Sequence, residues 1–312
     1  MASMKKYNYI LFHHPCNDGF LSFVLLHKFG LLENDVYTKG VPADITKVPP
    51  NIKNRDVIIV DLNIKTELLM KIVEISRSVF FIDHHHERNA NLNHPKLTVL
   101  VNLESCSSKI IWDTFNPNKR KKMPDLIKYV DDLDRMANKY PESSVFMTAY
   151  EVHYNDDFGK NDKSIKEKNM EKVEKISALL DNPKEQKKLV KLGAQYSLYK
   201  YQITKRSMNN FESVTVKTGE NRTWKVLVSN IGGFCAKLVS SQFQMFDTFD
   251  CTMTWYYNCQ IKGIIVLCRS KHHNITWLLQ RYNGDGHERA GTFKFGCRSI
   301  YDWLDHHNGC AI

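Results

Sequence analysis

Residues 79–86 read VFFIDHHH, four apolar residues followed by an acid and three histidines. Two earlier stretches have a similar form, because VIIVD at 57–61 ends in an acid and YILFH at 9–13 ends in a histidine. Helical patterns of apolar residues follow the first two of these runs, at 20–29 and 66–75. Short β-branched and aromatic runs that alternate with helices are typical of βαβ units. The sequence therefore predicts an α/β fold whose N-terminal part is a mainly parallel sheet flanked by helices.

The pattern changes twice farther along the chain. Helices are predicted at 107–115 and 126–136, with a basic loop between them, and a long helical stretch at 165–211 breaks near Asn182-Pro183. Strands are predicted at 213–218, 224–228, 252–257 and 263–269, helices at 235–243 and 275–281, and a glycine-containing loop at 283–291. We expect three parts: a domain at 1–160, a basic helical linker at 161–211, and a smaller α+β domain at 212–312. A cleft is expected between the two domains.

Charge and composition narrow the class of protein. The 312 residues carry a net charge of +10, and residues 160–206 hold 13 basic and 6 acidic residues, a net +7. This balance favours polyanionic partners, although a solvated lysine-rich linker has the same pattern. No apolar run approaches the ~18 residues of a membrane span, and no secretory leader precedes the first strand, so a cytoplasmic location is expected. None of the eight cysteines forms a C-x-x-C pair, which argues against a zinc ribbon.

Chemically active side chains follow each of the three predicted strands. In open α/β sheets, ligands bind beyond the carboxyl ends of the strands. The first strand leads to His13, His14 and Asp18, the second ends in Asp61, and the third in Asp83 and its histidines. Another acid cluster, residues 131–134, lies on a later helix. Asp18 or Asp61 alone could simply cap a helix or a turn, but together this set indicates a metal site.

Carboxylates with imidazoles suit Mn²⁺, iron or Zn²⁺. Several carboxylates together also suit two metals about 3.5–4 Å apart. Such a pair can bind a bridging water, lower its pKa and direct it at phosphorus. Crowded acids would repel one another without a cation, so a metal accounts for their clustering.

These motifs resemble those of the DHH family of phosphoesterases. Asp83-His84-His85 is the triplet that gives the family its name, and CNDGF at 16–20 is similar to the first motif, in the branch that usually reads C-P-D-G-F. VIIVDLNI around Asp61 and YVDDLD at 129–134 are similar to the second and fourth motifs. LCRS at 267–270 and GDGHERAG at 284–291 resemble motifs of the DHH-associated domain. The resemblance spans most of the chain and keeps the order of the motifs.

The resemblance implies a role for each matching residue of the first domain. Two Mn²⁺ ions, with Mg²⁺ or another divalent cation as alternatives, would be bound by Asp18, Asp61, His84 and Asp132. Asp61 would bridge the ions, and His13 or His14 would add an imidazole. Asp83 would orient the histidines, and His85 would donate to the scissile phosphate.

The resemblance also implies an anchor for the substrate in the second domain. Arg269, Ser270 and His287 would bind a phosphate or the substrate end, and Gly284 and Gly286 would let backbone amides approach that anion. The sequence departs from the family pattern in three places. Cys16 stands where many members have a metal-binding Asp, Asp285 replaces a loop glycine, and AGTF at 290–293 differs from the usual A-A-G-F.

The function expected from this pattern is hydrolysis of phosphodiester or phosphomonoester bonds by a two-metal, bridging-hydroxide mechanism. The substrate would be a short oligonucleotide, a nucleic-acid end or a related nucleotide, as for an exonuclease or oligonucleotidase. An exopolyphosphatase or a cyclic-dinucleotide phosphodiesterase would use the same metal chemistry. Cys16 motivates a different class, a catalytically inactive nucleic-acid-binding scaffold. No membrane partner is expected, and the chain would be a monomer or a homodimer.

Overall fold

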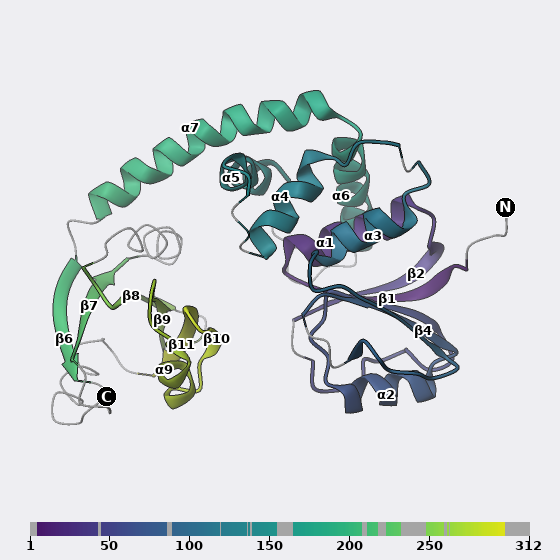
Figure 1. Ribbon diagram of the computed structural model, residues 1–312, viewed down its shortest axis with the longest axis horizontal. Coiled ribbons are helices and arrows are strands. Elements are labelled where there is room, and N and C mark those ends of the chain that lie inside the picture. The colour runs from purple at the N-terminus through teal and green to yellow at the C-terminus, as the bar shows by residue number, and fades with distance from the viewer. Residues whose placement is uncertain are drawn as a thin grey trace. The chain divides into compact units, whose positions relative to one another are not determined.

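The computed structural model divides the chain into two compact units, Met1–Ser197 and Leu198–Ile312 (Figure 1). It describes residues 5–42, 45–85, 89–118, 120–135, 137, 139–154, 165–207, 211–217, 223–231, 248–258, 261 and 263–296. The predicted helix at 235–243, the end of the predicted helix at Met136, and His86 and Glu87 lie outside these residues. Each unit has its own sheet and its own apolar core.

The sheet of the first unit has five parallel strands in the order β2-β1-β3-β4-β5. The strands are β1 (Tyr7–His13), β2 (Leu32–Val41), β3 (Asp56–Val60), β4 (Ser78–Asp83) and β5 (Leu97–Val101). Strand β3 is buried along its whole length, as expected for a central parallel strand with helices on both faces. The predicted α/β fold with a parallel sheet is confirmed.

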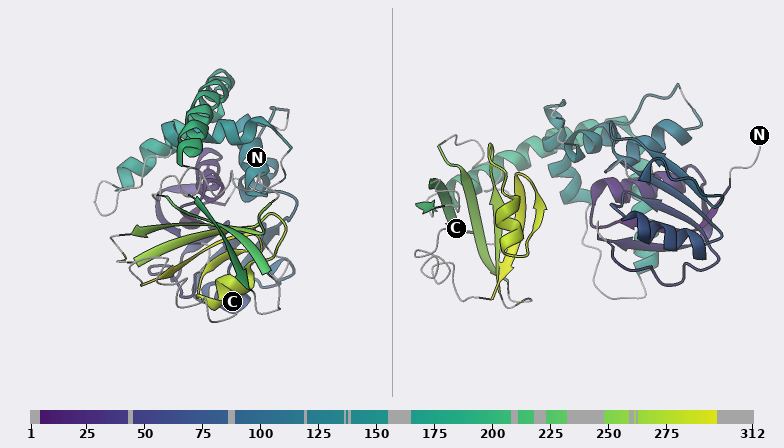
Figure 2. Two further views of the ribbon diagram at one scale, coloured as in Figure 1. Left: turned by 90° about the vertical axis from the view of Figure 1, so that its left-hand side faces the viewer. Right: turned by 60° about the horizontal axis from the view of Figure 1, so that its bottom comes forward.

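Helices cover both faces of this sheet (Figures 1 and 2). Side chains of β1 alternate between the two cores, since Ile10 and Phe12 pack with one cluster and Tyr9 and Leu11 with the other. Helix α2 (Thr66–Ile75) packs in the cluster that contains Tyr9. The opposite cluster includes side chains of six of the described helices: α1 (Asn17–Lys28), α3 (Ser107–Phe115), α4 (Asp125–Asp134), α5 (Glu142–Tyr154), α6 (Ile165–Leu180) and α7 (Pro183–Ser207).

From residue 165 to residue 207 the basic segment is helical, with a break at the predicted place. Helix α6 ends at Leu180 and α7 (Pro183–Ser207) begins after Asn182. Val173 and Ile176 of α6 and Leu189 of α7 are buried in the core of the first unit. This core therefore includes part of the segment expected to be a linker. No helix among the described residues is long and apolar enough to cross a membrane.

The second unit is built on a six-stranded sheet in the order β10-β11-β9-β8-β7-β6 (Figure 2). Its strands are β6 (Phe211–Lys217), β7 (Thr223–Asn230), β8 (Cys251–Asn258), β9 (Gly263–Arg269), β10 (Asp285–His287) and β11 (Ala290–Phe295). Strands β7 and β8 are parallel, and every other pair is antiparallel. Helix α9 (Thr276–Arg281) packs through Leu278 and Leu279 into the core of this unit.

The glycine-containing segment 283–291 was predicted to be a loop, and this is wrong. Most of it forms the hairpin of β10 and β11, in which Gly286 pairs with Gly291. Gly286 has a φ of +148°, and a Cβ there would overlap the backbone of residues 290 and 291. The close approach of two backbones therefore explains the glycine at this position.

Candidate metal centre

The candidate site lies at the point where the strand order of the first sheet reverses, between β1 and β3. From β1 the chain continues to β2 on one side, and β3 and β4 follow on the other, so a crevice forms beyond the carboxyl ends of β1 and β3. His13 is the last residue of β1, and Asp61 comes directly after β3. These two residues stand on opposite sides of the crevice, where the topology favours a ligand.

Asp61 is held in an unusual backbone conformation. Its φ is +59°, in the left-handed region that Asp and Asn tolerate better than most residues. Its N–H donates to the carbonyl of Ile82 over 3.0 Å, which ties the end of β3 to β4. The side chain is 1% exposed. Such strain at a buried acid is a feature of functional sites.

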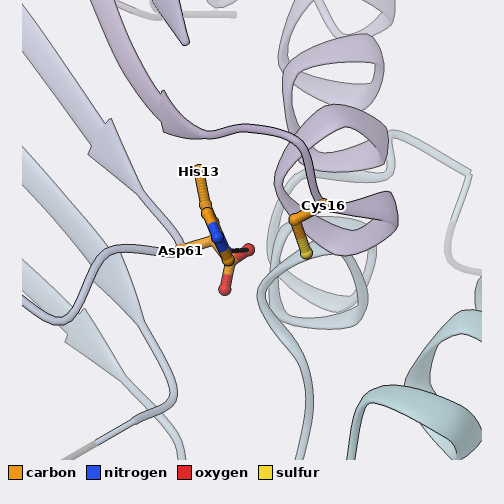
Figure 3. A group of neighbouring side chains, drawn as sticks. All are labelled: His13, Cys16 and Asp61. Atoms are coloured by element: carbon orange, nitrogen blue, oxygen red, sulfur yellow. Dashed lines mark ion pairs between the residues drawn. The ribbon is translucent and has the colours of Figure 1, made fainter. Parts of the chain in front are cut away.

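The two carboxylate oxygens of Asp61 face different imidazoles. Oδ1 lies 3.1 Å from Nε2 of His84, and Oδ2 lies 3.3 Å from Nδ1 of His13. The thiol of Cys16, at the start of α1, faces the same carboxylate (Figure 3). Asp61 is therefore central to the group, with potential ligands on both sides.

His84 lies among three carboxylates. Its Nε2 is 3.1 Å from Asp61, 3.2 Å from Oδ2 of Asp134 and 3.8 Å from Oδ2 of Asp18. Asp134 belongs to the last turn of α4, whereas Asp18 belongs to the first turn of α1. Residues far apart in the sequence thus converge on one imidazole.

Asp18 is fully buried, and the start of α3 compensates for its charge. The backbone N–H groups of Ser107 and Ser108 donate to its two oxygens, each over 2.8 Å. Unpaired amides at a helix N-terminus favour a negative charge. Helix α3 therefore fixes the orientation of a carboxylate that comes from α1.

The pKa values indicate that the cluster holds excess negative charge. Burial and the neighbouring charges of Asp61 and Asp134 raise the pKa of Asp18, and burial and Asp61 raise the pKa of Asp134. Burial opposes the charged form of Asp61, but His13 and His84 outweigh it and lower the pKa of Asp61 to about 2. Burial likewise opposes the charged form of His84, but Asp61, Asp18 and Asp134 outweigh it and raise the pKa of His84 to about 9. The group therefore favours a bound proton or cation.

Gly19 allows α1 to approach this group closely. A Cβ at this position would lie 2.9 Å from Cβ of His13 and 3.0 Å from Oδ2 of Asp61, and it would overlap the carbonyl oxygen of His13. Any larger residue would push the first turn of α1 away from the crevice. The glycine thus has a steric role in the geometry of the site.

His85 is positioned by the acid that precedes the histidines. Nδ1 of His85 lies 2.7 Å from Oδ1 of Asp83, whose side chain is buried. The rings of His84 and His85 are 4.4 Å apart, and both histidines offer a nitrogen to a group with Asp61. Asp83 therefore fixes the tautomer and orientation of His85.

The acid of α4 that reaches His84 is Asp134 and not Asp132. Asp132, predicted to be a ligand, accepts hydrogen bonds from the N–H groups of Lys139 and Tyr140 and from the hydroxyl of Ser143. It is 2% exposed and orders the turn before α5. Asp134 instead reaches His84, although the resemblance assigned no role to this acid. The expectation for Asp132 is therefore corrected, because its carboxylate is occupied by this turn.

Of the two histidines after β1, His13 lies in the group. A ring nitrogen of His13, a carboxylate oxygen of Asp61 and the sulfur of Cys16 all lie within 4.8 Å of one another. His14 is in none of the metal-binding groups among the described residues. It packs instead against Gly40 of β2, and burial and the charge of Lys172 lower its pKa.

The donor set fits a divalent cation. Three groups share residues and overlap: His13, Cys16 and Asp61; Asp61, His84 and His85; and Asp18, His84 and Asp134. The buried Oδ2 of Asp61 receives no hydrogen bond of good geometry. Carboxylates and imidazoles suit Mn²⁺, iron or Zn²⁺, and the thiol adds a softer ligand. Burial and the charges of Asp61 and Asp18 raise the pKa of Cys16, so its thiolate would form only beside a cation.

The predicted anchor residues of the second unit lie around the end of β9. Arg269 ends β9 and is half-buried, which lowers its pKa. The hydroxyl of Ser270 donates to the carbonyl of Asp250 over 2.6 Å, and its N–H donates to Arg289. His287 belongs to β10 in the same sheet, but its side chain lies outside the described part.

The glycines of this segment have structural roles. The N–H of Gly284 donates to the carbonyl of Leu279 at the end of α9, so this amide is not available to an anion. A Cβ on Gly284 would lie 2.6 Å from the carbonyl oxygen of Thr292. The amide of Gly284 itself is therefore engaged within the fold, and the approach of neighbouring backbone amides to an anion stays a prediction.

Comparison with known proteins agrees with the predicted fold. No protein-family model matches the chain. Uncharacterized protein R106 of Acanthamoeba polyphaga mimivirus is 23% identical over 302 residues, which are 92% of this chain and 67% of that protein. Among solved structures, the pGpG-specific phosphodiesterase PggH from Vibrio cholerae aligns with a TM-score of 0.55 and 17% identity, over 96% of this chain and 97% of that chain.

A second solved structure is an exopolyphosphatase-related protein from Bacteroides fragilis. It aligns with a TM-score of 0.48 and 12% identity, over 97% of this chain and 91% of that chain. The alignment with PggH spans almost the whole of both chains. The chain therefore shares the fold of PggH, which agrees with the DHH-family fold that its motifs predict.

Proposed function

We propose that the chain is a divalent-metal-dependent phosphoesterase that hydrolyses the phosphodiester or phosphomonoester bonds of a short oligonucleotide, a nucleic-acid end or a related nucleotide. The observation that carries the proposal is the convergence of Asp18, Asp61, His84 and Asp134 at the carboxyl edge of a parallel sheet. Three acids around one imidazole repel one another unless a cation is bound. They lie where the strand order reverses, which is the usual ligand site of such sheets.

Two neighbouring cations account for the arrangement better than one. Asp61 presents one oxygen toward His13 and the other toward His84, so it is the residue that would be shared. His13 and Cys16 would complete one side, and Asp18, His84 and Asp134 the other. When bound, such cations acidify water and offset negative charge on a phosphoryl group.

His85 supplies a proton donor next to this group. Because Asp83 holds Nδ1 of His85 at 2.7 Å, Nε2 is the nitrogen left to contact a substrate. The carboxylate stabilises the protonated ring and raises the pKa of His85, although burial opposes this. We assign to His85 a hydrogen bond to a phosphoryl oxygen of the substrate, with Asp83 as its positioning residue.

The second unit would bind the substrate end. Arg269 and Ser270 follow one another at the end of β9, and His287 belongs to β10. A guanidinium suits a phosphate because it offers a fixed fork of donors. In this division, residues 1–160 hold the metal centre and residues 212–312 bind the substrate.

The similar fold of PggH favours a short oligonucleotide. That protein is a phosphodiesterase specific for pGpG, a dinucleotide, and it aligns over nearly the whole of this chain. The net charge of +10 is in keeping with an anionic substrate. Polyphosphate and cyclic dinucleotides are the competing substrates, and an inactive scaffold is the competing role.

A substrate panel tests the proposal. The purified chain is incubated with Mn²⁺ and with pGpG, a 12-nucleotide RNA, single-stranded DNA, polyphosphate or cyclic di-GMP, and products are separated by chromatography. We expect the linear nucleotides to be hydrolysed, and Asp61→Asn to remove this turnover while its folding is unchanged. Metal analysis of the same samples gives the number of bound ions. Tight nucleotide binding with no turnover in Mn²⁺, Mg²⁺ or Zn²⁺ would identify a scaffold and refute the proposal.

A further inference from the structure

Helix α7 presents a line of exposed basic residues that the metal centre does not use. Over residues 183–207 the helix has seven basic residues and one acid. Figure 1 shows α7 as one uninterrupted helix. At 100° per residue, nine exposed side chains fall within about 60° of one line along the helix. These nine, called here the α7 stripe, are Lys184, Lys187, Lys188, Lys191, Gln195, Leu198, Gln202, Lys205 and Arg206.

The opposite face of α7 anchors it to the first unit only over its first half. Gln186 bonds to the backbone of Leu126 and Leu179, and Leu189 is buried in the core. Gly193 is the last buried residue of α7 in the described part of the chain, and a Cβ there would overlap the carbonyl of Val145. The helix nevertheless continues to Ser207. Tyr196 is the last residue of α7 that packs against this core in the described part of the chain, so the turns beyond it are retained without core packing.

Aromatic side chains flank the stripe in this second half. Tyr199 is 65% exposed and Tyr201 is 49% exposed, and they lie on opposite sides of the stripe. Lysines precede them and Lys205 and Arg206 follow them. Exposed rings that stand between two groups of cations are able to bind single-stranded nucleic acid, since cations contact phosphates and rings stack on bases.

A small pocket adjoins the N-terminal end of the stripe. It is lined by His153 and Tyr154 of α5, Lys175 of α6, and Glu185, Lys188 and Leu192 of α7. The ammonium of Lys175 lies 5.1 Å from the centre of the Tyr154 ring and donates to the carbonyl of His153. Lys188 lies 3.3 Å from Glu185, so the pocket has two cations and one acid.

We propose that the α7 stripe is a binding surface for single-stranded nucleic acid. The inference deepens the proposed function, on which it rests for the class of substrate. From residue 184 to residue 206 the helix is ~33 Å long, about the length of ten stacked nucleotides and fewer extended ones. The surface is therefore long enough to contact strands longer than a dinucleotide.

Charge reversal on the stripe tests this assignment. Lys187→Glu/Lys191→Glu changes two exposed residues that make no ion pair among the described residues. Lys53→Glu/Lys71→Glu, exposed in the first unit and away from α7, is the matched control. Binding of a 5′-fluorescein-labelled 12-nucleotide RNA to each full-length protein is measured by fluorescence anisotropy in EDTA, which prevents metal-dependent hydrolysis.

The α7 variant is expected to bind at least about tenfold more weakly than the control. The slope of log affinity against log salt should fall by about 1.4, or 0.7 for each lost phosphate contact. Tyr199→Phe should bind as the unchanged chain does, and Tyr199→Ala several-fold more weakly, because stacking needs the ring. Equal affinity of the α7 variant and its control would overturn the inference.

The results separate this inference from the proposed function. Binding in EDTA does not need turnover, so hydrolysis of no substrate would refute the phosphoesterase and leave the surface standing. Turnover with unchanged RNA affinity in the α7 variant would refute the surface alone. A variant that keeps RNA affinity but loses binding to phosphatidylserine vesicles would show that the stripe serves a membrane and would also overturn the inference.

Discussion

Replacement of Gly19 by alanine should damage the metal centre although no ligand is changed. The added Cβ would lie 2.9 Å from Cβ of His13 and 3.0 Å from Oδ2 of Asp61. Ordinary carbon contacts are about 3.5–4.0 Å, and the overlap with the carbonyl oxygen of His13 is closer still, so the first turn of α1 must move by roughly 1 Å or more. This movement displaces Asp18 and Cys16, which are in or next to the same turn.

The magnitude follows from two opposing effects. Overpacking in a close-packed site costs about 1–3 kcal/mol, and alanine in a helix recovers about 0.5–1 kcal/mol relative to glycine. We expect the free energy of unfolding of Gly19→Ala to fall by ~1–2 kcal/mol without added metal. Displaced ligands should weaken Mn²⁺ binding by about 10–100-fold, the range seen when the support of a metal ligand is lost.

Gly30→Ala is the matched control. Gly30 lies past the other end of α1 with a φ of +72°, and a Cβ there would meet nothing within 4 Å. The left-handed backbone makes alanine cost about 1–2 kcal/mol, similar to Gly19→Ala. Urea unfolding should therefore show comparable destabilisation, while calorimetric titration with Mn²⁺ shows a loss of affinity only for Gly19→Ala. Equal Mn²⁺ affinities in the two variants would refute the steric reasoning.

Four other predictions concern the acids and the thiol. Asp134→Asn should lower Mn²⁺ affinity at least about tenfold and leave urea unfolding unchanged. Asp132→Asn should instead lower the free energy of unfolding by about 1–3 kcal/mol and leave Mn²⁺ affinity unchanged. The reverse pattern would show that Asp132 is the ligand. Burial raises the pKa of Asp132, but hydrogen bonds from Ser143 and the backbone outweigh it and hold this pKa below its usual value. The stability that ionised Asp132 contributes is therefore present above about pH 4 and is lost as pH falls through the pKa of the folded state. Acid unfolding curves of the unchanged chain and Asp132→Asn should converge, and parallel curves would contradict the assignment. Mn²⁺ at 100 times its Kd should stabilise the fold by about 2.7 kcal/mol, reversibly with EDTA, and a similar gain in Asp61→Asn would count against the site. Cys16→Asp should bind Mn²⁺ about tenfold more tightly, and Zn²⁺ should protect Cys16 from iodoacetamide as followed by peptide mass spectrometry; alkylation at an unchanged rate would exclude the thiol as a ligand.

The central strands of the first sheet and several helices could be predicted from the sequence. Strands β1, β3 and β4 are apolar runs because both of their faces are covered. The helices at 66–75 and 107–115 have the predicted bounds. Strand β2 was not predicted, since LENDVYTKGV at the sheet edge is polar and half-exposed. An edge strand needs no continuous apolar face, and so its pattern is weak.

The ligands at strand ends could be named from the sequence, but the one on a helix could not. The topology of a parallel sheet brings Asp61 and His84 together whatever their exact orientation. On α4, Asp131, Asp132 and Asp134 fall within one turn, and both Tyr129 and Val130 above them are buried. Helical periodicity therefore does not decide which acid faces the site. The packing of α4 against α5 decides it.

The left-handed backbone at Asp61 restricts how such a centre can decay over evolutionary time. Where selection for catalysis is relaxed, most replacements at this position would be removed because they harm folding, and asparagine or glycine would survive. A descendant that keeps the architecture without the chemistry should therefore reveal itself by an amide or a bare backbone at residue 61. That single position can be read as a record of whether a lineage still depends on the reaction.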